Sequence, residues 1–405
     1  VQPPKETHAL TQQETSDKDP SWAHAQSYIY VYHGYQFIEY RFTNMTSTFC
    51  LPHLTEDKIM TRTFKRTALV IGANGGIGSA ITTALHDHGW KVRALVRTPP
   101  KADQSNADGI DWRVGDAMCR HDVLNASRGV DVIIHAVNPP GYRNWSKLVL
   151  PMLDNTITAA IVNKARIVLP GTVYNFNEDQ LSNLTETSPQ LPNTRKGAIR
   201  VEMERRMRRA VHSGATGLIV RAGDFFGPGA NNNWFSQCLI KAGQPVREIT
   251  YPGKAGVGHQ WAYLPDVAET IVRLLDQPDV LGSFTQFHLQ GHWDNDGTQM
   301  IAAIKRAVGN PDIPIKSLPW TMIGLLRPFV PFFREAWEIR YLWRNPARMH
   351  NDRLRALFDN EPHTPLDVAV HRTLDALGCL APLDHQEQNT RPDQPVATPP
   401  HLRMV

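Results

Sequence analysis

The stretch Thr67-Ala-Leu-Val-Ile-Gly-Ala-Asn-Gly-Gly-Ile-Gly-Ser-Ala-Ile81 joins an apolar strand to a helix through three spaced glycines. Gly72 allows a tight exit from the strand, Gly75 lets backbone approach a ligand, and Gly78 lets the helix pack closely on the sheet. The helix N-terminus would offer free N–H groups and partial positive charge to an anion. The strand before and the helix after favour a pyrophosphate site over a glycine-rich turn without ligand. We expect a dinucleotide to contact Gly72, Asn74, Gly75, Gly76, Ile77 and Gly78.

Short apolar stretches alternate with helical patterns through most of the chain. Strands are predicted at 67–72, 91–97, 111–114, 130–136, 166–169, 217–221 and 283–289. Helices are predicted at 77–88, 148–164, 197–212, 265–276 and 299–308. Apolar strands separated by helices predict a parallel sheet covered on both faces. The expected fold class is therefore α/β, a doubly wound parallel sheet over residues 66–290 with an appended, mostly helical part at 291–380.

The two ends of the sequence differ from this pattern. Residues 1–60 are polar and then aromatic without a clear period, and a short basic segment follows Met60. We expect residues 1–60 to be disordered or a non-native extension, with Met60 as the natural start; an N-terminal arm packed on the domain is the alternative. Residues 381–405 are rich in Pro and Gln and are expected to be disordered.

Composition excludes several classes of protein. The net charge of +4 over 405 residues is too small to indicate a nucleic-acid partner. Four scattered cysteines, without a CxxC or a His/Cys cluster, indicate reduced thiols in a cytoplasmic protein and no metal site. No stretch of 18 apolar residues predicts a membrane span, and residues 1–20 lack the apolar core of a signal peptide. A small-molecule substrate is the expected partner.

The second predicted strand ends in Arg97, where an acid would accept a hydrogen bond from the ribose 2′-hydroxyl of NAD. A guanidinium suits a 2′-phosphate, so NADP(H) is favoured over NAD; a solvated arginine is the alternative. Asp116, after the third strand, is either an acceptor for the adenine amino group or part of an Asx turn. Ala136 and Asn138 follow the fourth strand, where backbone would pass beside ribose and phosphates.

Taken together, these residues resemble the short-chain dehydrogenase/reductase superfamily, in its extended or atypical branch, which includes the NAD-dependent epimerase/dehydratase family. The resemblance covers about residues 66–290 and implies a Rossmann fold that binds NAD(P). It also implies an oxidoreductase or epimerase acting on a small carbonyl or hydroxyl compound. Its markers are the glycine spacing, Gly115-Asp116, Gly171-Thr-Val-Tyr174, Arg221-Ala-Gly-Asp-Phe-Phe-Gly-Pro228 and Trp261-Ala-Tyr-Leu-Pro-Asp-Val-Ala268.

The sequence departs from this superfamily where the proton chemistry is expected. Similar proteins carry a Ser or Thr after the fifth strand and Tyr-x-x-x-Lys on the next helix. Here Lys196 occupies the Tyr position, Arg200 the Lys position, and Pro170 the usual place of the serine. Helical periodicity places Lys196 and Arg200 on the inward, apolar face, so bound cofactor is the expected partner of both cations. The alternative is that both reach solvent from the first turn.

Four residues are candidates for catalysis. Lys196, with its pKa lowered by burial and by Arg200, could donate a proton; Tyr174 is the next candidate. Thr172 would donate a hydrogen bond to a substrate oxygen, and Arg200 would hold the ribose. The missing Tyr-x-x-x-Lys favours a second hypothesis, a non-catalytic NADP(H)-binding redox sensor. The aromatic segment 320–343 is expected to be a lid over an apolar or aryl substrate, a helix packed on the core, or an interface.

Overall fold

The structure is a computed structural model that describes residues 66–100, 109–139, 144–230 and 232–380, and the backbone of two N-terminal strands. The chain divides into two units, Val1–Thr63 and Phe64–Val405. In the first, β1 (Ser27–His33) and β2 (Gln36–Phe42) form an antiparallel pair. Apart from these strands, the expectations for residues 1–60 and 381–405 concern positions outside the described residues.

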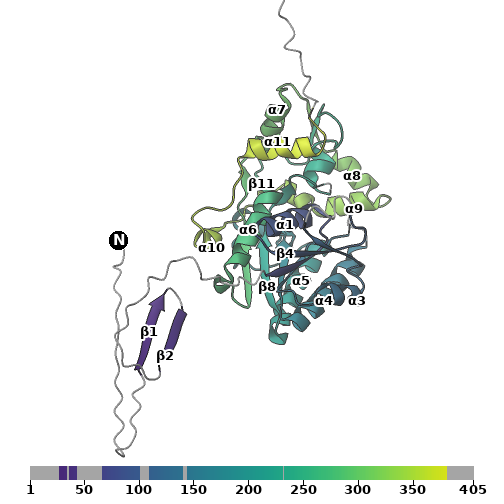
Figure 1. Ribbon diagram of the computed structural model, residues 1–405. Helices are drawn as coiled ribbons and strands as arrows, with labels where there is room; N and C mark the ends of the chain where they lie inside the picture. Colours follow the sequence, from purple (N-terminus) through teal and green to yellow (C-terminus); the bar gives the residue numbers. More distant parts are fainter. Residues whose placement is uncertain are drawn as a thin grey trace, which may run out of the picture. The chain divides into compact units, whose positions relative to one another are not determined.

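A seven-stranded parallel sheet lies at the centre of the second unit (Figure 1). From β3 the chain runs outward to β4 and β5 and then returns to β6 on the other side of β3. The predicted doubly wound parallel sheet is confirmed, and ligands of such sheets bind at the carboxyl ends of the strands beside this reversal. The strand order is β12 (Phe284–His288), β8 (Thr216–Arg221), β7 (Arg166–Gly171), β6 (Val132–His135), β3 (Thr67–Ile71), β4 (Lys91–Val96) and β5 (Asp111–Val114).

Helices cover both faces of this sheet (Figure 1). Side chains alternate along β3, so Ala68 and Val70 share one core with α1 and α6, while Leu69 and Ile71 share another with α3, α4 and α5. Burial on both faces explains why the strand reads as one continuous apolar run. The helices are α1 (Gly76–Asp87), α6 (Leu264–Asp276), α3 (Arg120–Ala126), α4 (Trp145–Asn163) and α5 (Arg195–Ala210).

A second, three-stranded sheet joins the part of the chain after residue 290 to the part before it. It consists of β9 (Asp224–Phe226), β11 (His259–Tyr263) and β13 (His292–Asp294). Buried residues of β9 and β11 share one core with α7 (Gln299–Val308) and α11 (Leu366–Ala376). Packing therefore crosses residue 290, and the domain boundary placed there remains a prediction.

Two short helices, α8 (Trp320–Leu326) and α9 (Pro331–Glu338), form a hairpin that leaves several large apolar side chains exposed. These side chains are Met322, Leu325, Leu326, Phe329 and Phe332. The remaining elements described here are β10 (Ile249–Tyr251), its parallel partner β14 (Ile315–Ser317), and α10 (Asp352–Arg355).

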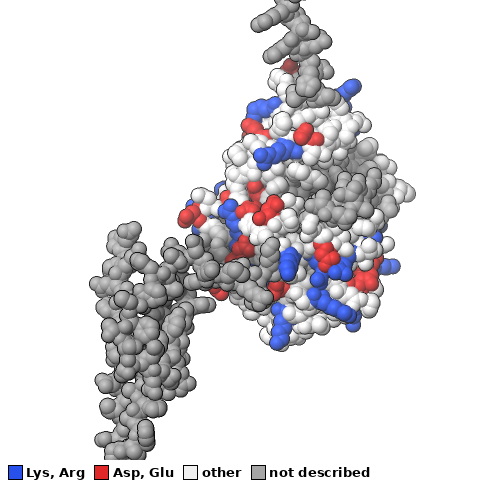
Figure 2. Space-filling model, in the orientation of Figure 1, with Lys and Arg blue, Asp and Glu red and all other residues white. Residues whose placement is uncertain are grey.

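Basic and acidic side chains are interspersed on the face that Figure 2 shows. The arginines of α5 likewise lie beside acidic or aromatic side chains. Arg205 and Arg206 both pair with Glu202, Arg206 also reaches Asp154, and the Arg208 guanidinium lies over an aromatic ring. The run is thus divided among separate partners and does not form one continuous basic surface.

Candidate functional site

A cavity of about 960 Å³ opens at the carboxyl ends of the central strands. Residues that follow β3, β4, β5, β6 and β7 form one side of it. Residues after β9 and residues of the α8–α9 hairpin also line it. The cavity lies where strand order reverses, the place at which ligands bind in doubly wound sheets.

The glycine turn after β3 forms a tight cradle against this cavity. Gly72 has a φ of +90°, and a Cβ there would lie 2.8 Å from the Val137 backbone. Gly75 donates its N–H to the Gly72 carbonyl oxygen at 3.0 Å and precedes the first turn of α1. A Cβ on Gly78 would lie 2.2 Å from the same carbonyl oxygen. These close approaches leave the N–H groups at the start of α1 beside the cavity, a geometry that fits an anion.

Nine of the ten residues expected to bind cofactor line the cavity. The exception is Gly78, which is buried behind the turn and allows α1 to approach β3. The lining residues are Gly72, Asn74, Gly75, Gly76, Ile77, Arg97, Asp116, Ala136 and Asn138. Asn74 also donates a hydrogen bond to the Thr98 carbonyl oxygen at 2.8 Å, which joins the glycine turn to the end of β4.

Arg97 is exposed at the end of β4, lines the cavity, and makes no hydrogen bond or ion pair with another described residue. Arg93, on the same strand, is instead held by Asp111 at 3.0 Å. Asp116 accepts a hydrogen bond from the Met118 N–H at 2.9 Å, so the Asx turn expected as an alternative is present. Its other carboxylate oxygen is not used in that turn.

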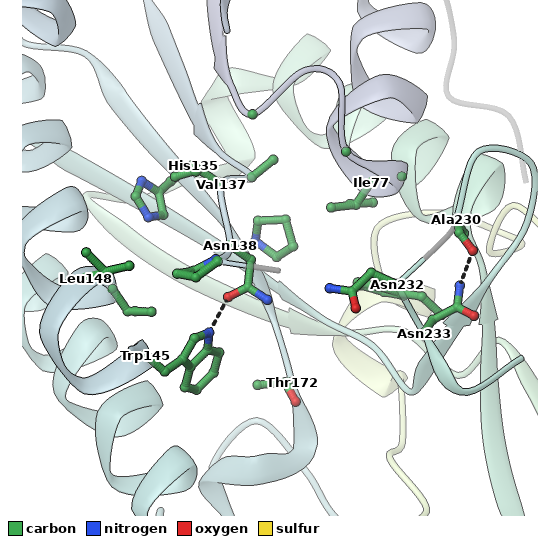
Figure 3. A pocket seen from close by; sticks show the side chains of 18 of the residues that line it. Ile77, His135, Val137, Asn138, Trp145, Leu148, Thr172, Ala230, Asn232 and Asn233 are labelled. Carbon is green, nitrogen blue, oxygen red and sulfur yellow. Dashed lines mark hydrogen bonds between the residues drawn. The ribbon is translucent and has the colours of Figure 1, made fainter. Parts of the chain in front are cut away.

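The end of β6 supplies the cavity wall in Figure 3. The Asn138 side-chain oxygen accepts a hydrogen bond from the Trp145 indole N–H at 2.6 Å. His135 is buried, and its Nδ1 lies 2.8 Å from the Thr156 hydroxyl. Burial lowers the pKa of His135 to about 3, and the charge of Arg200 adds to this shift. The imidazole is therefore neutral at physiological pH.

Three of the four candidate catalytic residues line the cavity together: Thr172, Tyr174 and Arg200. The Thr172 hydroxyl accepts a hydrogen bond from the Tyr174 N–H at 3.4 Å, and the Arg200 guanidinium lies 5.2 Å from the centre of the Trp145 ring. Behind them, buried Arg221 donates to the Thr172 carbonyl oxygen at 2.6 Å and pairs with Glu204 at 2.8 Å. This buried ion pair fixes the backbone that carries Thr172.

The fourth candidate, Lys196, is placed differently from the expectation. It is buried as predicted, but it does not line the cavity. Its ammonium bonds the carbonyl oxygen of Glu335 at 2.6 Å and the carboxylate of the same residue at 2.8 Å. Burial lowers the pKa of Lys196, and the contact with Glu335 partly opposes this shift. The neighbouring cation that lowers the pKa further is Arg195, whereas Arg200 was expected in that role. Bound cofactor was the expected partner of Lys196, but Glu335 of α9 is the partner that the structure shows. The reason is that the inward face of α5 meets α9 at this end.

Two groups of lining residues were missed as site residues by sequence reasoning. Asp224 begins β9 and lies 2.9 Å from Nε2 of His259, yet it entered the sequence argument only within a superfamily marker. Phe332 and Phe333 of α9 also line the cavity. Residues of α8 and α9 line the cavity, and Trp343 is buried in the core. That segment 320–343 acts as a lid remains a prediction.

Neither a metal centre nor a membrane span is found among the described residues. No group of three or more His, Cys, Asp or Glu side chains there could hold a metal ion. Cys119, Cys238 and Cys379 are free thiols, and Cys50 lies outside the described residues. In the same part of the chain, no helix is both long and apolar enough to cross a membrane.

The parallel sheet, its point of reversal and the glycine cradle define a nucleotide-binding Rossmann protein. Over residues 68–289, more than half of the chain, the sequence matches the NAD dependent epimerase/dehydratase family. The chain belongs to that family. This confirms the resemblance drawn from the sequence and the expectation of an NAD(P)-dependent oxidoreductase or epimerase/dehydratase. No curated protein matches the chain.

Solved structures of epimerases share the fold at low sequence identity. UDP-N-acetylglucosamine 4-epimerase from Bacillus cereus is 18% identical with a TM-score of 0.59, over 78% of this chain and 98% of that one. UDP-glucose 4-epimerase from Bifidobacterium longum, in complex with NAD+ and UDP, is 15% identical with a TM-score of 0.59, over 76% and 97%. A nucleoside-diphosphate-sugar epimerase from Pseudomonas aeruginosa is 16% identical with a TM-score of 0.59, over 77% and 97%.

Proposed function

We propose that the chain binds NADP(H) in this cavity and uses it in an oxidoreductase or epimerase reaction on a small carbonyl or hydroxyl compound. The observation that carries the proposal is the glycine cradle at the start of α1, with Arg97 lining the same cavity at the end of β4. When bound, the cofactor supplies hydride transfer. The protein supplies binding, orientation and proton donors.

Different lining residues would contact different parts of the cofactor. The turn from Gly72 to Ile77 would hold the diphosphate and Arg97 the 2′-phosphate. The Asp116 carboxylate oxygen left outside the Asx turn would accept from adenine, and residues 136–138 would flank the ribose and phosphates. Arg200 would hold the nicotinamide ribose. Tyr174 is the proposed proton donor and Thr172 the hydrogen-bond donor to a substrate oxygen, because Lys196 is bound to Glu335 outside the cavity.

Arg97→Glu tests the cofactor assignment. Placing a carboxylate beside a 2′-phosphate removes a charge-assisted hydrogen bond and adds repulsion, so we expect NADPH affinity to fall by about 100-fold. NADH affinity should change by less than about threefold, since it has no phosphate at that position. Titration calorimetry with each nucleotide measures both constants.

Lys91→Glu is the matched control, because Lys91 is an exposed cation at the opposite end of the same strand. It makes the same charge change far from the carboxyl ends of the strands and should leave both affinities unchanged. Equal losses of NADPH and NADH binding in Arg97→Glu would contradict the NADP assignment.

The position of Lys196 also favours a second candidate function, a non-catalytic NADP(H)-binding redox sensor. Lys196, at the usual Tyr position, is bound to Glu335 and does not line the cavity, so it does not serve there as a proton donor. NADPH oxidation with a panel of aldehydes and ketones separates the two functions. Turnover that is lost in Tyr174→Phe supports the enzyme, whereas tight NADPH binding without turnover of any compound supports the sensor.

A further inference from the structure

The part of the cavity lining that residues 224–238 and 318–339 supply is largely apolar. Its polar lining consists mainly of Asp224 and the amides Asn232, Asn233 and Gln237. Phe332 is 45% exposed, so the apolar lining continues from the cavity to the surface. The apolar residues are Trp234, Leu318, Ile323, Phe332, Phe333, Ala336 and Ile339.

This part of the lining carries one carboxylate and no lysine or arginine among its described residues. Asp224 lines the cavity and its carboxylate accepts a hydrogen bond from Nε2 of buried His259 at 2.9 Å. The His259 ring in turn stacks on Trp343, with centroids 3.9 Å apart and planes 7° from parallel. The carboxylate is therefore held in place by a rigid ring against the core. It cannot turn away without breaking this contact.

Cations are placed elsewhere in the cavity. Among the described lining residues they are Arg97, at the end of β4, and Arg200, beside Trp145 on α4. Neither belongs to the segments that form this apolar part of the lining. A diphosphate buried there would lose its water next to a carboxylate and without a cation from those segments.

We infer that the substrate is an uncharged, apolar carbonyl or hydroxyl compound, such as an aryl ketone, and that Asp224 discriminates against phosphorylated substrates. The inference rests on the proposed function and names its substrate class. Burial of aromatic or alkyl surface against Phe332, Phe333 and Ile323 would supply affinity. Repulsion by a fixed carboxylate is a means of rejecting a competing ligand. The solved UDP-glucose 4-epimerase in complex with NAD+ and UDP sets the contrasting case.

Two probes compare the substrate classes on the full chain saturated with NADPH. The probes are 4-phenyl-2-butanone, an uncharged aryl ketone, and UDP-glucose. Titration calorimetry is expected to show binding of the ketone at least about tenfold tighter than that of UDP-glucose. NADPH binding is measured first on the same sample, because its absence would overturn the proposed function as well as the inference.

Two variants locate the cause of this selectivity. Phe333→Ala should weaken ketone binding by about tenfold through lost apolar contact and leave NADPH binding unchanged. Its matched control is Phe329→Ala, an 82% exposed residue of the same hairpin that does not line the cavity. Asp224→Asn should strengthen UDP-glucose binding by about tenfold and leave ketone binding within about twofold. Asp279→Asn, at an exposed site outside the cavity lining, removes the same charge as its control.

Each outcome either supports or overturns the proposed substrate class. Binding of the ketone that depends on Phe333, with weak UDP-glucose binding relieved by Asp224→Asn, supports the substrate class. Tighter binding of UDP-glucose than of the ketone overturns it while leaving the NADP(H)-dependent function intact. Failure of the NADPH-loaded protein to bind either probe also overturns it.

Discussion

Gly78 is a position at which the fold cannot accommodate a side chain. A Cβ there would lie 2.2 Å from the Gly72 carbonyl oxygen, and backbone atoms cannot move aside as a flexible side chain could. We expect Gly78→Ala to lower the free energy of unfolding by about 2 kcal/mol and to weaken NADPH binding, because α1 must shift away from the glycine turn. Urea denaturation and calorimetry measure the two effects.

Gly282→Ala provides the control for this substitution. The nearest atom to a Cβ at Gly282 is 3.8 Å away, which is ordinary contact. Its stability should change by less than about 0.5 kcal/mol. Gly78→Ala protein as stable as the parent would show that the turn does not constrain α1.

His135 makes the stability of the fold depend on pH. Burial takes its pKa from the ordinary value of 6.5 to about 3 in the folded protein. Between these values the unfolded chain binds a proton that the folded chain does not, so stability falls as pH falls from about 6.5 toward 3. His135→Gln should make this decline shallower by up to about 1.4 kcal/mol per pH unit.

Denaturation midpoints between pH 7.5 and pH 4.5 measure this slope. His121→Gln is the control, because His121 is exposed on α3 and its surroundings change little on unfolding. Burial also lowers the pKa of His288 to about 3, so part of the pH dependence of stability should remain in the His135→Gln variant. A slope identical to that of the parent would contradict the burial effect.

At the scale of elements, Lys196 links α5 to α9. Its ammonium and its backbone N–H contact Glu335 and Glu338, and α9 covers the cavity. Lys196→Met should leave the buried Glu335 carboxylate without its closest cation and cost about 3 kcal/mol. We expect α9 to lose amide protection in hydrogen-exchange mass spectrometry before the central sheet does.

Arg195→Met is the matched control for this link. Arg195 contacts the same Glu335 carboxylate at 3.2 Å, but its side chain is 59% exposed. Exposed pairs contribute less than about 1 kcal/mol, so α9 should keep its protection in this variant. Lys196→Met with unchanged stability and unchanged exchange in α9 would contradict the linking role.

Elements with local signals were predicted and elements made by distant pairing were not. The strands of the large sheet and α1, α4, α5, α6 and α7 lie within a few residues of their predicted bounds. The sheet β9–β11–β13 was missed, because strands of three to five residues show little period and pair across more than thirty residues. Asp266 lies in the first turn of α6 and accepts hydrogen bonds from Thr364, a contact across about a hundred residues that no local pattern predicts.

At the scale of the whole molecule, the three-stranded sheet depends on the C-terminal part of the chain. β13 pairs with β11, and α7 and α11 cover the buried rings of Phe226 and Trp261. A chain shortened to end after Gln290 should therefore expose this core, bind the dye ANS and unfold without a cooperative transition. Circular dichroism and ANS fluorescence measure this.

The matched comparison is a chain that ends after Leu380, which keeps α11 and the core contacts of Cys379. We expect it to unfold cooperatively and to bind NADPH as the full chain does. Cooperative unfolding of the chain that ends at Gln290 would show instead that the boundary near residue 290 separates independent folding units.

The sequence by itself determined the parallel sheet, the glycine turn and the family, because these depend on local periodicity and on residues adjacent along the chain. It also placed Thr172, Tyr174 and Arg200, which line the cavity together. Only the tertiary structure decided the partner of Lys196, the position of Asp224 beside His259, and the apolar part of the cavity lining. These depend on contacts between segments far apart in the chain, which packing forms and no local pattern records.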